Sequence, residues 1–282
     1  MGSRRLRWLL VSPFLVVLLL VLWGVMDSSS GASARTMWND TWRNAEGVQL
    51  GGYLVTPVQA RRVVSRPATG TPAPAIPSGD GRYPAVLLLH EWWGLNKDIS
   101  YLSEQLAADG YVVLVPDLLR GRLSVTIPGA LFQMLTTSAD RIDRDLDRAF
   151  LRLRDVPEVD PDRIAVVGFC FGGTQAMRLG MRNEELYATA IFYGGNPISD
   201  RSEVGHLGAR GPVLGVYGAK DRTISEDRVT AFEGALREAG VEHEFHIFPE
   251  EGHAFVTSSS IRRSRAAADA WDLLRGFLRR HL

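Results

Sequence analysis

The fold is decided by one stretch, Arg163-Ile-Ala-Val-Val-Gly168-Phe-Cys170-Phe-Gly172-Gly173. An apolar β-branched run leads into it and a helical pattern follows, so the sequence predicts a strand, a sharp turn and a helix. A glycine stands two positions before and after Cys170, as such a turn requires, because a Cβ there would collide with neighbouring backbone. The turn would raise the Cys170 sulfur to the end of the sheet, at a helix N-terminus that favours a thiolate.

Cys170 is the single cysteine of the chain, so it has no intramolecular disulfide partner, and one thiol is too few for a cysteine-based metal site. A lone cysteine is by default a small buried hydrophobe. The surrounding turn favours a nucleophile instead, and the backbone N–H of Phe171 would then donate to an oxyanion.

Outward from this turn, apolar runs typical of buried strands alternate with helical patterns. Strands are expected at 84–90, 111–116, 163–168, 188–193, 212–217 and 242–248, and helices at 98–109, 128–156, 171–181, 225–239 and 261–281. This alternation predicts an α/β fold with a mostly parallel central sheet and helices on both faces. Short strands are expected within 37–57, and the Pro/Ala-rich segment at about 58–82 is predicted to be a long surface loop.

The composition limits the class of protein. The chain has 282 residues, 45% of them hydrophobic, which suits one catalytic domain over 35–282 after a targeting segment. Its 32 basic and 32 acidic residues balance, which argues against nucleic acid as a partner. The sequence has neither a zinc-type ligand cluster nor a phosphate-binding glycine loop, so no metal or organic cofactor is expected.

Residues 1–34 have the layout of an export signal. Arg4, Arg5 and Arg7 precede the apolar run Trp8–Met26, and Ala32-Ser33-Ala34 has the form that signal peptidase accepts. The segment is interpreted as a cleaved signal peptide or as an uncleaved hydrophobic anchor helix, and its length favours the anchor. A buried core helix is the third alternative. With the arginines cytoplasmic, the catalytic domain would lie outside the cytoplasm.

An acid and a histidine follow the cysteine turn in the order typical of α/β-hydrolases. Asp221 ends a strand in a small-residue loop, where a side chain would point into a site at the sheet edge; it could also be a turn or N-cap residue, and Asp227 is the alternative acid. His253 stands in a loop after a strand, next to Gly252. It would accept the thiol proton, and Asp221 would orient its ring.

Together the motifs resemble the dienelactone hydrolase family. The match runs from about Thr41 to the C-terminus and rests on His90-Glu91-Trp92-Trp93-Gly94, Val115-Pro116-Asp117-Leu118, Gly168-Phe169-Cys170-Phe171-Gly172-Gly173 and Gly252-His253-Ala254-Phe255. The resemblance implies an α/β-hydrolase fold and a Cys170-Asp221-His253 triad. It also implies that Glu91 pairs with the thiol and controls its ionisation, and that the Trp92 N–H is the second oxyanion donor. A structural salt bridge is the alternative role for Glu91.

The chain departs from the family pattern where a substrate carboxylate would bind. The arginine that the family places four residues after the histidine is Thr257 here. Arg120 and Arg122 lie near the place of a second arginine, and Arg262 and Arg263 are further candidates. The expected activity is cleavage of a small ester or lactone, with Trp93 in the acyl pocket. A catalytically silent membrane-tethered binding module and a thiol redox sensor are the alternatives.

Overall fold

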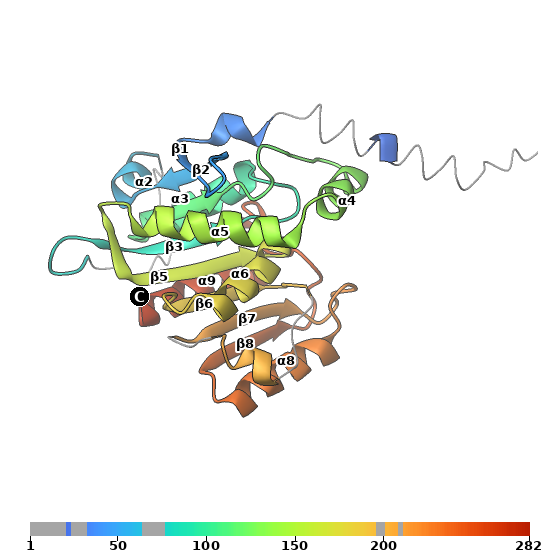
Figure 1. Cartoon of the computed structure of the whole chain (residues 1–282). Coiled ribbons are helices and arrows are strands. Elements are labelled where there is room, and N and C mark those ends of the chain that lie inside the picture. The colour runs from blue at the N-terminus through green and yellow to red at the C-terminus, as the bar shows by residue number, and fades with distance from the viewer. Residues whose placement is uncertain (1–20, 24–32, 64–76, 196–200, 208–210) are drawn as a thin grey trace, which may run out of the picture.

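A single twisted sheet forms the framework of the molecule. The computed structural model describes residues 21–23, 33–63, 77–195, 201–207 and 211–282. Within them the strands run in the order β1-β2-β4-β3-β5-β6-β7-β8 across the sheet (Figure 1). Their bounds are β1 Asp40–Arg43, β2 Gln49–Val55, β3 Tyr83–Leu89, β4 Val112–Pro116, β5 Val159–Phe169, β6 Ala188–Phe192, β7 Val213–Gly218 and β8 His243–Phe248.

The sheet is parallel from β4 to β8, and β1 and β2 are its antiparallel edge. In a parallel sheet the carboxyl ends of neighbouring strands meet at one edge, where α/β proteins bind their ligands. The predicted α/β-hydrolase fold with a mostly parallel sheet is thereby confirmed.

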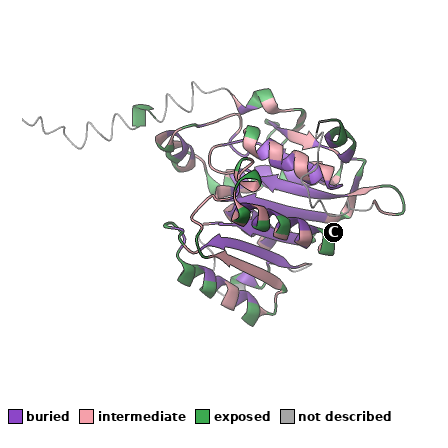
Figure 2. Cartoon of the chain, turned by 180° about the vertical axis from the view of Figure 1, so that it is seen from behind, coloured by how far each residue is buried: buried purple, intermediate pink, exposed green. Residues whose placement is uncertain are grey.

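Helices cover both faces of the sheet. They are η1 Ala34–Met37, α2 Pro57–Val63, α3 Lys97–Ala108, α4 Ile127–Leu135, α5 Ala139–Arg154, α6 Phe171–Arg182, α7 Arg201–Val204, α8 Glu226–Ala239, η2 Ser260–Arg262 and α9 Arg265–His281. Along β3, Val86 and Leu88 share a core cluster with α3 and α9, whereas Leu87 and Leu89 pack with α5 and α6. The central strands are consequently buried along their length (Figure 2), and their alternate residues serve opposite faces.

Two predicted elements were wrong in their extent. The expected loop at 58–82 includes α2, which begins with a reciprocal cap: the Gln59 N–H donates to Thr56 Oγ1, and the Thr56 N–H donates to Gln59 Oε1. The long helix expected at 128–156 is two helices, α4 and α5. The hydroxyls of Thr136 and Thr137 donate to carbonyls of the last turn of α4, and such bonds compete with continued helix.

The predicted N-terminal targeting segment lies largely outside the described residues, which include only 21–23 and 33–34 of it. In the part of the chain that the structure describes, no helix is long and apolar enough to cross a membrane. The middle of the predicted Pro/Ala-rich loop, 64–76, also lies outside the described residues.

Candidate active site

Cys170 lies on the turn between β5 and α6, at the carboxyl edge of the sheet. Its backbone has φ 53° and ψ −113°, a strained conformation for a residue with a side chain. The Cys170 N–H donates to the Phe192 carbonyl at 3.0 Å, which ties the turn to the end of β6. The helix that begins at Phe171 therefore has the sulfur at its N-terminus.

The flanking glycines are required by the close approach of backbone segments. A Cβ on Gly168 would lie 2.0 Å from the Gly172 carbonyl oxygen. A Cβ on Gly172 would lie 2.3 Å from the carbonyl oxygen of Leu89, at the end of β3. The collision expected from the sequence is thus present at both positions, and no larger residue fits either place without moving Cys170.

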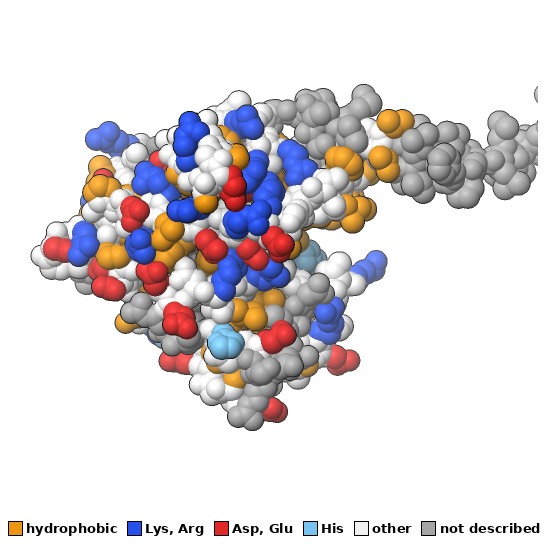
Figure 3. Space-filling model, viewed as in Figure 1, with side chains coloured by type: hydrophobic (Ala, Val, Ile, Leu, Met, Phe, Trp, Pro, Cys, Tyr) orange, Lys and Arg blue, Asp and Glu red, His pale blue; other side chains and the backbone are white. Residues whose placement is uncertain are grey.

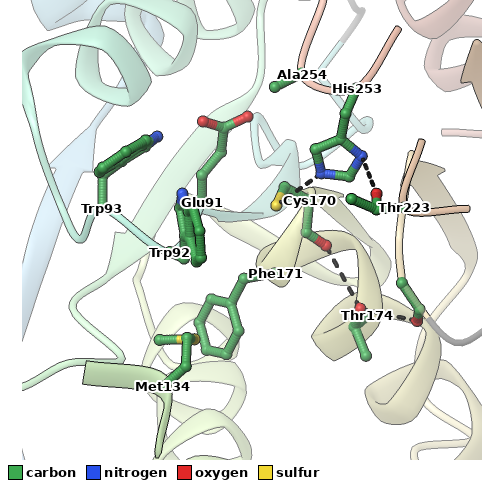
Figure 4. A pocket seen from close by; sticks show the side chains of 11 residues that line it. Glu91, Trp92, Trp93, Met134, Cys170, Phe171, Thr174, Thr223, His253 and Ala254 are labelled. Atoms are coloured by element: carbon green, nitrogen blue, oxygen red, sulfur yellow. Dashed lines mark hydrogen bonds between the residues drawn. The ribbon is translucent and has the colours of Figure 1, made fainter. Parts of the chain in front are cut away.

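The three predicted triad residues come together at this edge. His253 Nε2 lies 3.0 Å from Cys170 Sγ (Figure 4), and His253 Nδ1 lies 2.6 Å from Asp221 Oδ2. The Asp221 carboxylate follows β7, and His253 follows β8, in the loops that the sequence indicated. With the proton on Nδ1, the imidazole donates to Asp221 and its Nε2 accepts from the thiol, which is the arrangement a general base needs.

Thr223 is a positioning residue that the sequence reasoning missed. Its hydroxyl donates to Asp221 Oδ1 at 2.7 Å and lies 3.1 Å from His253 Nδ1. The N–H groups of Thr223 and Ile224 also donate to Asp221 Oδ1. Burial alone would raise the pKa of Asp221, but hydrogen bonds from Thr223 and His253 outweigh burial and leave that pKa below its usual value. Asp221 is therefore a fixed anion behind the ring.

The cysteine rests as a thiol. Burial, and then the charge of Glu91, raise the pKa of Cys170 to about 12, although the N–H groups of Phe171 and Trp92 act in the opposite direction. The helix N-terminus was expected to favour a thiolate, and its N–H does so, but desolvation is the larger effect. Ionisation therefore has to be coupled to proton transfer to His253. The same two N–H groups, close enough to the sulfur to lower its pKa, are the predicted oxyanion donors.

Glu91 lies on the other side of the sulfur, with its carboxylate directed toward the cavity between Trp93 and His253 (Figure 4). Burial, and then the charge of Asp98, raise the pKa of Glu91 to about 7, and the Trp93 side chain partly lowers it. Glu91 Oε1 is buried without a hydrogen-bond partner. The structure shows no salt bridge for this carboxyl group among the described residues, so its alternative structural role has no support.

Hydrogen bonds of the buried His90 ring connect the loop that carries Trp92 to the segment that follows β4. His90 Nδ1 donates to the Glu91 carbonyl at 2.7 Å, and His90 Nε2 accepts from the Leu118 N–H at 3.2 Å. Asp117 then accepts from the Trp38 indole at 3.0 Å. These contacts explain why the motifs that begin at His90 and Val115 occur together, because His90 of the first motif is hydrogen-bonded to Leu118 of the second.

The triad opens into a cavity of about 410 Å³. Its described lining comprises Glu91, Trp92, Trp93, Met134, Cys170, Phe171, Thr174, Gly195, Thr223, His253 and Ala254. Mainly apolar side chains therefore surround the sulfur, and this described lining contains neither lysine nor arginine. Trp93 lies where it was predicted.

The structure places the predicted carboxylate-binding arginines elsewhere. Arg120 makes a bidentate ion pair with the buried Asp145, at 2.8 and 2.7 Å. Arg122 donates to the hydroxyls of Thr136 and Thr137 at the end of α4. Arg262 stacks over the Tyr101 ring, 5.4 Å from its centre. Local partners thus hold these guanidinium groups, and none of them lines the cavity.

Tyr193 packs against His253 and is a second residue of the site that the sequence did not indicate. It is fully buried, has φ 38°, and its hydroxyl donates to the Val256 carbonyl at 3.1 Å. Its ring meets that of His253 edge to face, with centres 5.2 Å apart. These two contacts connect the end of β6 to the loop after β8 that carries His253.

Comparison with known proteins gives a consistent result. The family model described as "Dienelactone hydrolase family" matches residues 73–282. Two relatives are named "Putative carboxymethylenebutenolidase". The one from Aquifex aeolicus is 25% identical over 245 residues, covering 84% of this chain and 95% of its own. The one from Escherichia coli K12 is 30% identical over 207 residues, covering 68% and 74%.

Solved structures show the same fold. The structure named "Putative Dienelactone Hydrolase" from Klebsiella pneumoniae has a TM-score of 0.67 at 24% identity and covers 85% of this chain and 99% of its own. The dienelactone hydrolase-like promiscuous phosphotriesterase P91, from metagenomic libraries, also has a TM-score of 0.67, at 20% identity, with 86% and 97% covered. These likenesses support the architecture described above.

Proposed function

The chain belongs to the dienelactone hydrolase family and is a carboxylic ester hydrolase, and from this premise we propose that it cleaves uncharged esters or lactones through Cys170. The observation that carries the proposal is the unbroken line of contacts from Cys170 Sγ to His253, 3.0 Å, and from His253 to Asp221, 2.6 Å, at the wall of an apolar cavity.

The proposed reaction has two halves. In the first, the thiol proton passes to His253 Nε2 as the sulfur bonds to the carbonyl carbon, and the N–H groups of Phe171 and Trp92 hold the oxyanion. The C–O bond then breaks, the leaving oxygen takes the proton from His253, and a thioester remains. In the second half, water attacks the thioester, His253 takes and returns a proton, and the C–S bond breaks to release the acid and the thiol.

The charge of the cavity supports an uncharged acyl group. Its described lining has the Glu91 carboxyl and neither lysine nor arginine, while Arg120 and Arg122 are held by other partners. A substrate carboxylate about 6 Å from ionised Glu91 would cost about 3 kcal/mol at an effective dielectric of about 20. The indole and phenyl groups of Trp92, Trp93 and Phe171 suit an aromatic or aliphatic acyl part instead.

The test is hydrolysis of paired aryl esters by the full chain and by Cys170→Ala. Each pair has one ester with a free carboxylate on the acyl part and one with the matching methyl ester. We expect the parent to prefer the neutral member by about 100-fold, the rate equivalent of about 3 kcal/mol, and Cys170→Ala to lose turnover of both. Equal rates for parent and Cys170→Ala would refute the mechanism, and a preference for the carboxylate would refute the substrate class.

The composition of residues 4–34 supports a second part of the proposal, that the catalytic domain works outside the cytoplasm, attached to or exported across a membrane. The measurement is digestion of the catalytic domain by protease added to intact cells. Protection of the domain until the cells are broken would contradict this location.

A further inference from the structure

The outer face of α4 carries an apolar stripe beside the catalytic cavity. Ile127, Leu131 and Leu135 recur every fourth residue, so they lie along one side of the helix. They are 65%, 48% and 77% exposed, and Val125, just before the helix, is 77% exposed. We call these four residues the α4 stripe. Hydrophobic side chains gather over α4 in the space-filling view (Figure 3).

A grouped apolar surface of this kind marks an interaction site, whereas isolated exposed hydrophobes do not. None of the residues Ile127–Leu135 is charged. The next helix, α5, presents charged side chains to solvent, and Arg144, for example, pairs with Glu46 at 3.4 Å. The surface of α4 is therefore unlike that of its neighbour.

Both sides of α4 have contacts with the active site. Met134 lines the cavity and, seven residues after Ile127 and three after Leu131, lies on the stripe's own side of the helix. Gln133, fully buried on the opposite side, donates from Nε2 to the Trp92 carbonyl at 3.3 Å. The same residue, Trp92, supplies through its backbone N–H one of the two donors near the sulfur. One short helix thus joins the α4 stripe to the cavity through Met134 and contacts the loop that carries Trp92 through Gln133.

The chain itself indicates what covers the stripe. The apolar run Trp8–Met26 ends seven residues before Ser33. The Ser33 hydroxyl and the Ala34 N–H both donate to the Gly121 carbonyl at 3.2 Å, close to where the chain enters α4. Seven extended residues span at most about 25 Å. A bilayer that takes up the apolar run is therefore held within that distance of the loop that leads into α4.

Charge near this point also suits a lipid headgroup layer. Arg35 is exposed, and its guanidinium reaches the Arg120 carbonyl at 3.4 Å, next to Gly121. Arginine beside exposed aliphatic side chains is the combination typical of helices that lie in a membrane interface.

We propose that the α4 stripe lies on the lipid surface, so that the catalytic cavity opens toward the bilayer and takes its substrate from it. The lipid contact does not depend on catalysis. The second part, delivery of a lipophilic uncharged ester from the bilayer, rests on the proposed function.

The contact is tested in the full-length chain with Cys170→Ala, which leaves no cysteine. One new cysteine is placed at Leu131 and, as the matched control, at Val58, an equally apolar residue on α2 that is 55% exposed. Each variant is labelled with an environment-sensitive fluorophore and reconstituted in phosphatidylcholine vesicles with or without nitroxide-bearing lipid. We expect the Leu131 label to shift to the blue and to be quenched several-fold more than the Val58 label.

Three outcomes would overturn the lipid contact: equal spectra at the two positions, no association with vesicles, or a blue shift at Leu131 that lipid nitroxide does not quench. The last result would indicate a second copy of the chain on the stripe. Delivery is tested with Leu131→Ser, for which we expect a several-fold loss on an ester dissolved in vesicles and an unchanged rate on a water-soluble aryl ester. An equal loss on both would overturn delivery. A parent enzyme inactive on both esters would refute the proposed function while leaving the fluorescence result intact.

Discussion

Two carboxyl groups near Cys170 lie in opposite environments: Glu91 lies beside the sulfur in the cavity wall, and Asp221 lies behind the His253 ring. Asp221 accepts hydrogen bonds from Thr223, Ile224 and His253, and its pKa lies below the usual value. Glu91 has a buried oxygen without a partner, and burial raises its pKa to about 7. The environment, not the functional group, therefore decides which carboxyl group is ionised more readily. The pKa of Asp221 is lowered, which suits the proposed role of stabilising an imidazolium, and the pKa of Glu91, beside Cys170, is raised to about 7.

Replacing Asp221, whose two carboxylate oxygens are both hydrogen-bonded, has the largest expected effect on activity. In Asp221→Asn the ring loses both its charge partner and the acceptor that fixes the Nδ1 proton, so kcat/KM should fall by about 10⁴. The measurement is steady-state hydrolysis of a neutral aryl ester. Asp227→Asn, an exposed acid in the first turn of α8, is the matched control and should retain the parent rate. Similar losses in both variants would contradict the assignment of Asp221.

The second-largest expected effect is on the pH dependence of stability, when Glu91 is replaced, whose carboxyl group has a buried oxygen without a hydrogen-bond partner. The folded pKa of Glu91, about 7, lies above the ordinary 4.5, so between these pH values the folded state binds more protons than the unfolded state. Stability therefore falls as pH rises through this window, by up to about 3 kcal/mol. Urea unfolding at pH 5 and pH 8 should show that Glu91→Gln loses less free energy of unfolding than the parent over this interval. If the free energy of unfolding had the same pH dependence in both proteins, ionisation of Glu91 would not be what destabilises the folded state.

The same substitution should make the thiol easier to ionise. The Glu91 charge is the second cause of the raised Cys170 pKa, so Glu91→Gln should move the pH of half-maximal alkylation by iodoacetamide downward by about one unit. Glu104→Gln, which removes a carboxyl group that Tyr53 hydrogen-bonds on α3, serves as the control and should not move the profile. An upward shift in Glu91→Gln would reverse the sign of the proposed interaction.

The smallest expected effect concerns the hydroxyl between acid and base. Thr223→Val keeps the shape but removes a hydrogen bond to Asp221 Oδ1, which is worth about 1 kcal/mol and thus a loss in kcat of about five-fold. Thr223→Ser keeps the hydroxyl and should retain most of the rate. An equal loss in both variants would contradict the prediction, because Thr223→Ser keeps the hydroxyl that donates to Asp221.

Local patterns predicted the strand order along the chain and the turn around Cys170, because buried strands and the glycine spacing are properties of neighbouring residues. Asp221 and His253 could be proposed because each follows a strand and strand ends meet at one edge. Their mutual distances came only with the structure. The reciprocal cap that begins α2 was readable as Thr56-Pro-Val-Gln59 but was overlooked.

Other parts of the site depend on contacts between distant segments. Thr223 looks like an ordinary loop residue until Asp221 and His253 are placed beside it. Arg120 seemed available for a substrate carboxylate, but Asp145, on the solvent-facing pattern of α5, turns inward and binds it. The direction of a long side chain is decided by its partner, and the partner here lies 25 residues away.

The packing of Gly172 beneath the Leu89 carbonyl has a consequence for anyone who would rebuild this enzyme. The turn that carries Cys170 and the loop that carries Trp92 meet through backbone atoms, so neither can be grafted into another scaffold without the end of the adjoining strand. Transplanting the chemistry means transplanting β3 and β5 as a pair, with their spacing intact. Diversification by library methods is better aimed at Met134 and Trp93, where side chains alone face the cavity.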